Sequence, residues 1–314
     1  MKIRKNIPIY SICWLNHANG GQIRTFYEPE SREELESLCR SLYQQGKKFD
    51  LIGYTSNTYF LPSYNCDIMV STRKVKKTSI NQKTIIADCG VSVAKLARDM
   101  VRQGIDGFEG LIDLPGTIGA AIYGNASCYN CSINQLLLSF DLLRPDGQVV
   151  TLTPEVLHLS ERSSVLKRGQ LGGVILSATL RKKQGNPTLL LNIAEDNHKK
   201  RIATQPGPKD NLGSIYYNSG GWTRLSIIPR GIVSVYGVLL KIAGQGKEQI
   251  TENKKRAFLT ILGGRKVIPY FHGWNRYIWS DEQSHEQFWK YHRLHQLMFK
   301  NSTFEIEIKG ESPP

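Results

Sequence analysis

The sequence of 314 residues lacks the signatures of several large classes of protein. It has no Gly-Lys-Ser/Thr loop of the Walker type and no Gly-x-Gly-x-x-Gly fingerprint, which argues against two common modes of nucleotide binding. Its six cysteines are scattered through a long chain, which favours reduced thiols over a disulfide framework. No apolar run approaches the roughly 20 residues that cross a bilayer, so we expect no membrane span. The basic N-terminus precedes a short mixed segment without a cleavage site, and we expect a cytoplasmic chain without a signal peptide.

Acidic residues are scarce relative to basic ones. Lysine and arginine number 41 against 27 aspartates and glutamates, which gives a formal net charge of +14. Such an excess predicts anionic partners, either nucleic acid or phosphorylated small molecules. The basic residues are spread along the chain, with only small clusters such as 73–77, and no nucleic-acid-binding motif accompanies them. We therefore expect no nucleic-acid binding.

Glycine, by contrast, is concentrated in one stretch, residues 104–130, which reads GIDGFEGLIDLPGTIGAAIYGNASCYN. Within it, the segment LPGTIGAA predicts a tight turn that opens a short helix, with Pro115 in the first helical turn. Gly116 and Gly119 remove side chains that would keep a ligand away from the main chain. The free N–H groups at a helix start favour phosphate.

A second small-residue loop lies upstream, in residues 51–60 (LIGYTSNTYF). An apolar run ends in small polar residues and then resumes, which is typical of strand, loop and strand. Successive N–H groups here, with the hydroxyls of Thr55 and Ser56, can form an anion-binding nest. Two such loops fit a long ligand with a diphosphate in its middle.

The remaining pattern predicts an α+β chain. A helix is expected after Ser31, with Glu34 completing a capping box, and two more at 92–104 and 284–299. The expected strands share β-type runs bounded by turn residues and lie at 49–52, 66–72, 84–88, 136–144, 148–152, 173–180, 232–242 and 303–308. Composition turns polar around 183–200, which predicts a domain boundary there and two units, 1–190 and 191–314.

With both loops placed, the chain resembles the UDP-N-acetylenolpyruvoylglucosamine reductase family. The family patterns "lGgGSNll" and "GlxGlExlxgIPGtvGGAvxmNAGayG" correspond to IGYTSNTYF and to the glycine-rich stretch, in the same order and spacing. The resemblance covers residues 20–218 and the last dozen residues. It implies a vanillyl-alcohol-oxidase-type FAD-binding domain of two α/β subdomains, followed by a smaller α+β substrate domain.

The chemistry that the resemblance implies is an FAD-dependent reduction in peptidoglycan precursor synthesis. NADPH would deliver hydride to the flavin, and the hydride would then pass to the enolpyruvyl ether of a UDP-sugar. For the flavin, the resemblance implies a set of residues from the two loops and their surroundings: Gly53, Tyr54, Thr55, Ser56, Asn57, Pro115, Gly116, Thr117, Ile118, Gly119, Asn125, Ala126 and Val174.

Three catalytic residues follow from the same resemblance. Arg162 matches the family arginine, Ser214 the proton donor and Glu305 the acidic partner, with Glu307 as the alternative on the same strand face. Taken alone, Arg162 better fits a surface ion pair, while Ser214 also fits a turn serine and Glu305 the solvent face of an edge strand. Asn218 matches an asparagine that contacts substrate.

The chain departs from the family in several places. Tyr54 and Thr55 replace a glycine pair, Glu161 replaces a tyrosine, and residues 219–300 contain no clear counterpart of the family's "GxxVSxxHxNFivN". Two alternatives therefore stay open. One is a paralogous flavoenzyme that acts on another sugar or surface-polysaccharide precursor, and the other is a flavin-binding relative without turnover.

Two further groups of residues fit more than one interpretation. Cys128 and Cys131 form a lone Cys-x-x-Cys, which favours free thiols over a redox pair or a covalent flavin link. His285, His292 and His295 lie in one expected helix. A packed helix with exposed basic residues is favoured over a metal site, and no metal is expected.

Overall fold

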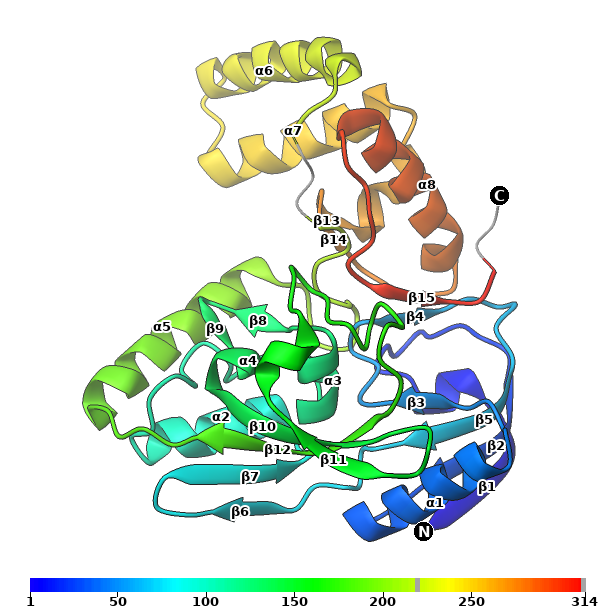
Figure 1. Cartoon of the computed structure of the whole chain (residues 1–314). Helices are drawn as coiled ribbons and strands as arrows, with labels where there is room; N and C mark the ends of the chain where they lie inside the picture. The colour runs from blue at the N-terminus through cyan, green and yellow to red at the C-terminus, as the bar shows by residue number, and fades with distance from the viewer. Residues whose placement is uncertain (218–220, 312–314) are drawn as a thin grey trace.

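A mixed four-stranded sheet forms the N-terminal part of this computed structural model, which describes residues 1–217 and 221–311 (Figure 1). Its order is β1-β2-β5-β3, with β1 antiparallel to β2, while β2 and β3 run parallel to β5. The strands are β1 (Lys2–Pro8), β2 (Gln22–Glu28), β3 (Asp50–Ile52) and β5 (Cys66–Ser71). The crossover from β2 to β3 runs through α1 (Arg32–Gln44).

Helix α1 begins as the sequence predicts, but with a different second contact. The Ser31 hydroxyl accepts the N–H of Glu34 at 3.3 Å. The Glu34 carboxylate accepts from the N–H of Glu30 at 2.8 Å and from the N-terminal ammonium group. Only half of the expected capping box therefore forms, because the Glu34 carboxylate binds these two groups instead of the Ser31 N–H.

A five-stranded sheet, antiparallel throughout, has the order β11-β10-β12-β7-β6. Its strands are β6 (Thr78–Ile80), β7 (Thr84–Asp88), β10 (Leu137–Leu143), β11 (Val149–Leu152) and β12 (Val174–Arg181). Three helices lie between or beside these strands: α2 (Val93–Arg102), α3 (Ile118–Tyr123) and α4 (Ile133–Leu136). Apolar residues of α1, α2, α3 and the five-stranded sheet share one core, which includes Leu35, Ala97, Ile118, Phe140 and Leu176.

Helix α5 (Pro187–Thr204) occupies the polar stretch where the sequence predicts a domain boundary. It packs on the first part of the chain, since the Asn197 amide donates to the Glu109 carbonyl at 3.3 Å and His198 contacts Asp113 at 2.7 Å. The division into 1–190 and 191–314 stays a prediction. The packing of α5 favours a first unit that includes this helix.

The C-terminal part is mainly helical. Its elements are η3 (Arg224–Ser226), α6 (Ile227–Ile242), α7 (Lys247–Ile261), η4 (Arg265–Tyr270), β13 (Phe271–Gly273), β14 (Arg276–Tyr277) and α8 (Gln283–Met298). An aromatic core that contains Tyr216, Trp279 and Phe288 holds α8 and the β13–β14 ribbon together. The hairpin of α6 and α7 extends beyond this core at one end of the molecule (Figure 1).

The prediction of a strand at 232–242 is wrong, because these residues lie within α6. Five β-branched residues suggested a strand, but Val233 and Gly237 recur at helical spacing and are buried. Packing between α6 and α7 therefore overrides local β propensity.

The same segment corrects a second expectation. Arg224–Ile242 has 19 residues and a mean hydropathy of 1.6, so by length and composition it meets the criteria for a bilayer span that the sequence analysis considered unmet. Only 17% of its most apolar window is buried.

The C-terminal segment returns to the first part of the chain. Strand β15 (Glu307–Lys309) pairs in parallel with β4 (Thr58–Phe60), directly after the first small-residue loop. The expected strand at 303–308 is therefore shorter and shifted, and Phe304 forms only a single bridge with Tyr216. This pairing brings residues near 305 beside the loop at 53–57.

The main chain around Gly90 leaves no room for a side chain. A Cβ atom at this position would lie 1.8 Å from the Thr72 carbonyl oxygen and 2.5 Å from that of Val75. Gly90→Ala is therefore expected to lower the free energy of unfolding by about 3 kcal/mol. In the control Gly231→Ala, the new Cβ would meet no atom within 4 Å, and about 0.5–1 kcal/mol of stabilisation is expected. Equal denaturant midpoints for both variants would contradict this packing.

Candidate active site

The first small-residue loop is held from behind by a partly buried arginine. Arg73 Nε donates to the Gly53 carbonyl at 2.7 Å, and Nη2 donates to the Ile12 carbonyl at 2.6 Å. Thr55 has a φ of +56° and its hydroxyl donates to the Tyr54 carbonyl at 2.7 Å. Burial lowers the pKa of Arg73, but a guanidinium remains charged. The loop therefore has a fixed positive charge behind its main chain.

Sequence analysis did not single out Arg73 as a site residue. It belongs to the basic cluster at 73–77, where a solvated surface is the usual interpretation. The available signal was its position directly after β5, which lies beside β3 in the sheet. The parallel pairing of β3 with β5 places Arg73 next to the loop that follows β3.

The second loop differs in detail from the sequence prediction. Helix α3 begins at Ile118 with Thr117 as its N-cap, so Pro115 lies before the helix and not in its first turn. The N–H of Ile118 donates to the Val91 carbonyl at 2.9 Å, and that of Gly119 to the Cys89 carbonyl at 2.8 Å. These two donors are consequently satisfied by protein. Any cofactor contact by Ile118 and Gly119 would depend on packing instead.

The two loops lie against each other. The Ser56 hydroxyl donates to the Pro115 carbonyl at 3.2 Å. A Cβ on Gly53 would lie 2.7 Å from Thr117 Oγ1, so only glycine allows this approach. Gly116 has a φ of +139°, and the nearest atom to a Cβ placed there would be Ser56 Oγ at 3.8 Å. The space beside Gly116 is therefore open apart from Ser56, as the close approach of a diphosphate requires.

Three other predicted flavin residues have structural contacts of their own. Asn125 has a φ of +46°, and its amide donates to the Ser160 carbonyl at 2.7 Å. The N–H of Ala126 donates to the Ala121 carbonyl at 2.9 Å. Val174 is buried at the start of β12. Their contacts with a cofactor stay predictions.

Arg162 and Glu305 come together from distant parts of the chain. Arg162 Nε lies 3.0 Å from Glu305 Oε1, and both side chains are partly buried. The Arg162 Nη1 atom donates to the carbonyl and the hydroxyl of Ser127, each at 2.9 Å. Burial raises the pKa of Glu305, and the positive charge of Arg162 opposes that rise. The site thus contains an oriented guanidinium beside a partly buried carboxylate.

The main chain of Glu305 connects this ion pair to the flavin loop and to Ser214. Its carbonyl accepts from the Asn57 amide at 3.2 Å, and its N–H donates to the Ile215 carbonyl at 2.8 Å. Ser214 directly precedes Ile215 and follows Gly213, which has a φ of +82°. The structure thus brings the Arg162 and Glu305 side chains into contact and places Ser214 next in sequence to Ile215, which accepts the Glu305 N–H. Asn218 lies outside the described residues.

Glu307 has a different partner. Its carboxylate lies 3.8 Å from Lys167 Nζ, which also donates to the Arg162 carbonyl at 3.2 Å. Glu305 and Glu307 both meet cations, while Ile306 between them is buried in the aromatic core. The expected shared face is confirmed. The direct contact with Arg162 favours Glu305 as the acidic partner.

The cysteine pair lies next to the Arg162 contact. Strands β8 (Ser127–Cys128) and β9 (Cys131–Ser132) pair Cys128 with Cys131, and all six cysteines are free thiols. Burial raises the pKa of both thiols. Protonated thiols react slowly, which supports the free-thiol interpretation.

Two of the histidines in α8 are part of the aromatic packing. The Tyr216 ring stacks on those of His292 and His295, with centroids 5.7 Å and 3.7 Å apart. Burial lowers the pKa of His292 to about 4 and that of His295 to about 3, so both are neutral at pH 7. Within residues 1–217 and 221–311, no group of three or more His, Cys, Asp or Glu side chains has an arrangement that would hold a metal ion.

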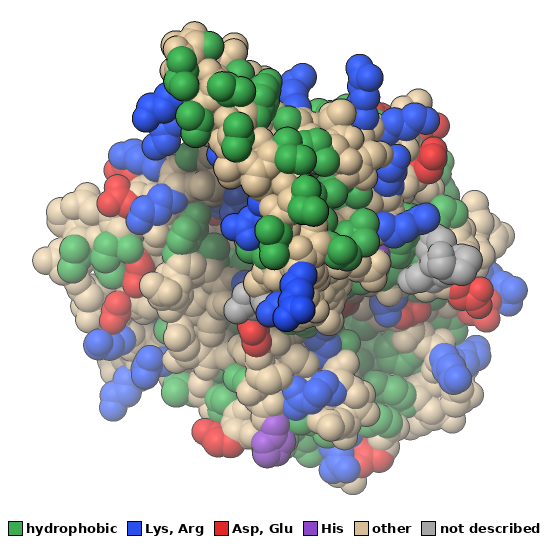
Figure 2. All heavy atoms as spheres, turned by 90° about the horizontal axis from the view of Figure 1, so that it is seen from above, with side chains coloured by type: hydrophobic (Ala, Val, Ile, Leu, Met, Phe, Trp, Pro, Cys, Tyr) green, Lys and Arg blue, Asp and Glu red, His purple; other side chains and the backbone are tan. Residues whose placement is uncertain are grey.

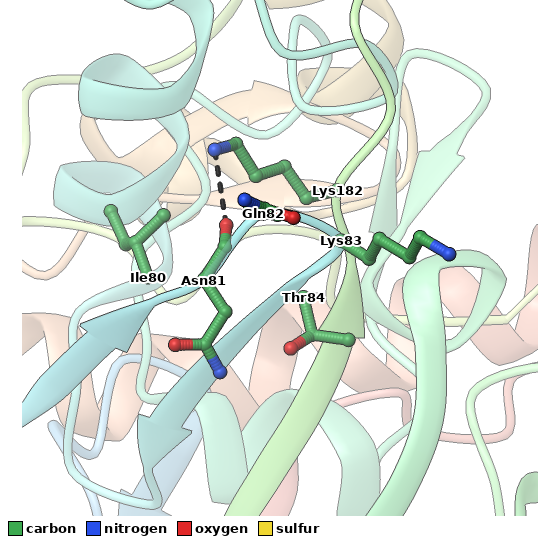
Figure 3. A pocket seen from close by; sticks show the side chains of 6 residues that line it. All are labelled: Ile80, Asn81, Gln82, Lys83, Thr84 and Lys182. Carbon is green, nitrogen blue, oxygen red and sulfur yellow. Dashed lines mark hydrogen bonds between the residues drawn. The ribbon is translucent and has the colours of Figure 1, made fainter.

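A shallow depression lies elsewhere, at the turn between β6 and β7 (Figure 3). The Lys182 ammonium group donates to the Asn81 carbonyl there at 3.1 Å, which closes one side of the depression. Its lining is Ile80, Asn81, Gln82, Lys83, Thr84 and Lys182. None of these residues belongs to the two loops or to the Arg162 contact, so we do not assign this depression to the active site.

Comparison with known proteins agrees with an FAD-binding fold. Residues 23–153 match the family model of an FAD binding domain. The chain is 30% identical over 210 residues to the UDP-N-acetylenolpyruvoylglucosamine reductase of Nostoc sp.. The aligned region covers 65% of this chain and 63% of the relative. The chain is similar to these reductases over about 65% of its length. The Bacillus pumilus reductase is 27% identical over 221 residues, covering 69% of this chain and 71% of that protein.

The fold agrees over nearly the whole length. The crystal structure of the Thermus caldophilus UDP-N-acetylenolpyruvylglucosamine reductase superposes with a TM-score of 0.65 at 17% identity, covering 98% of this chain and 99% of that one. The predicted α+β fold with its FAD-binding domain is confirmed. The chain spans about 63% of the length of the first curated relatives in the aligned region.

The raised pKa of Glu305 predicts a pH dependence of stability. The folded chain binds this proton more tightly than the unfolded chain does. The resulting stabilisation is present below the ordinary glutamate pKa and is lost as pH rises through the raised value. Because Glu305→Gln removes the titrating group, its melting temperature relative to the parent is expected to increase as pH rises from about 4 to neutral. A difference that stays constant across the pH series would contradict the assigned direction.

Proposed function

We propose that this chain is an FAD-dependent oxidoreductase that reduces the enolpyruvyl ether of UDP-N-acetylenolpyruvoylglucosamine with NADPH as the hydride donor. The observation that supports this most strongly is the Arg162–Glu305 contact at 3.0 Å, joined through the Glu305 main chain to Asn57 of the first loop. These residues are far apart in sequence, and a surface ion pair would not need this connection to the first small-residue loop. The relatives named above carry this activity in their names.

The two loops fit a flavin diphosphate. Gly116 leaves room for close approach, and the partly buried Arg73 supplies positive charge behind the first loop. A low-dielectric position makes that charge more effective toward a phosphate than a surface lysine would be. FAD, when bound, supplies the hydride chemistry between NADPH and the substrate double bond.

The remaining residues act on the substrate. Glu305 and Ser127 engage the Nε and Nη1 atoms of Arg162 and fix the direction of the guanidinium, which leaves Nη2 to donate to a substrate carboxylate. Positive charge next to the substrate carboxylate stabilises negative charge as it develops on the adjoining carbons. Ser214 is assigned as the proton donor, held by the turn at Gly213. A serine is a weak acid, so its position beside the developing carbanion must supply the effect.

Two half-reactions test the proposal separately. Anaerobic FAD-loaded protein is mixed with NADPH, and loss of the visible flavin absorbance is followed by stopped flow. UDP-N-acetylenolpyruvoylglucosamine is then added, and its reduced product is identified by mass spectrometry. Flavin bleaching followed by substrate-dependent reoxidation supports the proposal. Protein that is reduced by NADPH but never reoxidised by this substrate would contradict the substrate assignment.

A second candidate is a paralogous flavoenzyme that acts on another sugar or surface-polysaccharide precursor. The observation in its favour is the C-terminal part, where the exposed hairpin of α6 and α7 lies in the region without the family pattern. The half-reaction experiment separates the two candidates if other enolpyruvyl or keto sugar nucleotides are offered to the reduced protein. The third alternative, flavin binding without turnover, is disfavoured by the contact of Arg162 with Glu305.

A further inference from the structure

Helix α6 has an outer face made of apolar side chains. Ile228 is 74% exposed, Leu239 58% and Ile242 77%. At about 100° per residue, the residues of this face fall within an arc of about 140° that has no polar member. They are Ile227, Ile228, Gly231, Ile232, Val235, Val238, Leu239 and Ile242. Figure 2 looks onto this end of the molecule and shows exposed hydrophobic side chains along it.

The inner face of α6 already has its partner. Val233 and Gly237 are buried. A Cβ on Gly237 would lie 2.7 Å from the Lys254 side chain of α7, so the two helices are in close contact. A helix of a water-soluble protein normally turns polar residues outward once its inner face is packed. Here the outer face is apolar too, which indicates a second surface to bury.

The segment that carries this apolar face has only basic residues among its charged ones. Residues 211–247 contain no aspartate or glutamate but do contain Arg224, Arg230, Lys241 and Lys247. Arg230 lies over the Trp222 ring at 4.6 Å and Lys241 is in the last turn of α6. On the helical projection, Arg230 and Lys241 lie together on one flank of the apolar arc. Lysine and arginine side chains surround the exposed apolar groups in Figure 2.

We propose that the outer face of α6 docks the protein on an anionic lipid bilayer. The helix would lie in the plane of the interface, with its apolar arc among the acyl chains and its flanking cations on the lipid phosphates. About 16 residues of helix provide roughly 24 Å of contact along the surface. This activity is separate from the proposed reduction and uses none of its residues.

Charge distinguishes this occupant from the alternatives. A second copy in a two-fold dimer would place the same patch against itself, and the cations of one chain would meet those of the other. An anionic bilayer offers the complementary charge instead. Spanning the bilayer would require Arg230 to enter the hydrocarbon and the helix to leave the polar helix α7, which contains Glu248, Glu252 and Lys254.

Vesicle flotation of the full chain with added FAD tests the proposal. Vesicles of phosphatidylcholine are compared with vesicles that also contain phosphatidylglycerol, at low and high salt. The parent is expected to float with the anionic vesicles, with partitioning at least about tenfold higher than with neutral ones, and to lose much of this at high salt. The double variant Ile228→Glu/Leu239→Glu is expected to stay in solution.

Two matched variants complete the test. Leu189→Glu/Ile202→Glu changes two exposed apolar residues of α5, 56% and 68% exposed, and should float like the parent. Lys241→Gln/Lys247→Gln leaves the apolar arc intact and should weaken flotation on anionic vesicles, and melting temperatures check that each variant folds. The proposal is overturned if the parent fails to float, or if the Ile228→Glu/Leu239→Glu variant floats as well as the parent. A concentration-dependent dimer that those glutamates abolish, without vesicle binding, assigns the face to a second copy and also overturns it.

Discussion

Arg73→Ala is expected to weaken FAD binding by on the order of 100-fold. The substitution removes two charge-assisted hydrogen bonds to the carbonyls of Gly53 and Ile12, each worth about 1.5–3 kcal/mol. A loss of about 2.8 kcal/mol corresponds to a factor of 100 in the dissociation constant. The loop also loses the positive charge behind it. Equilibrium titration of apoprotein with FAD, followed by flavin fluorescence, measures the effect.

The neighbouring cation provides the control. Lys74 is more exposed and pairs with Glu30 at 2.8 Å, away from the loop main chain. Lys74→Ala is expected to bind FAD with unchanged affinity, because it removes a similar charge without touching Gly53. Arg73→Lys keeps the charge but not the forked geometry, and an intermediate affinity is expected. If Arg73→Ala binds FAD as tightly as the parent, the loop is not organised by this arginine.

Ser214→Ala is expected to lower turnover by about 10²–10⁴-fold while leaving reduction of the flavin by NADPH unchanged. The serine is assigned to protonate the substrate carbon, a step that belongs to the second half-reaction only. The first half-reaction requires no proton from this side chain. Stopped-flow measurement of each half-reaction separates the two outcomes.

Conservative replacement distinguishes a proton donor from a structural serine. Ser214→Cys retains a group that can supply a proton, so part of the activity is expected to return. Ser79→Ala, on the exposed strand β6, is expected to leave both half-reactions unchanged. Equal loss of flavin reduction and substrate reduction in Ser214→Ala would assign this residue to folding or flavin binding.

Local signals predicted much of the first part of the chain. Helix α2 has clear helical periodicity, and the β10–β11 hairpin has a Pro-Asp-Gly turn between its strands. Both elements lie within two residues of the expected bounds. The two glycine-containing loops were predicted from small residues after apolar strands, and the structure places them in contact through Ser56 and Pro115. These features depend on residues close together in sequence, so pattern alone suffices.

The features that sequence could not predict depend on long-range contacts. Arg73 resembles a solvated member of a basic cluster, and only the β3–β5 pairing puts it behind the loop. The contact between Arg162 and Glu305 was expected from family resemblance, whereas its connection to Asn57 depends on the β4–β15 pairing. The β-branched residues of α6 favour a strand locally, and the contact with α7 makes them helical.

The central claim is that two loops at 53–57 and 115–119, backed by Arg73, hold an FAD whose reactive edge faces the Arg162–Glu305 contact. Titration of the purified apoprotein with FAD tests this claim most directly. Saturable binding of one FAD per chain, bleached by NADPH and weakened in Arg73→Ala, is the expected result. A protein that stays colourless and shows no saturable change in flavin fluorescence would contradict it.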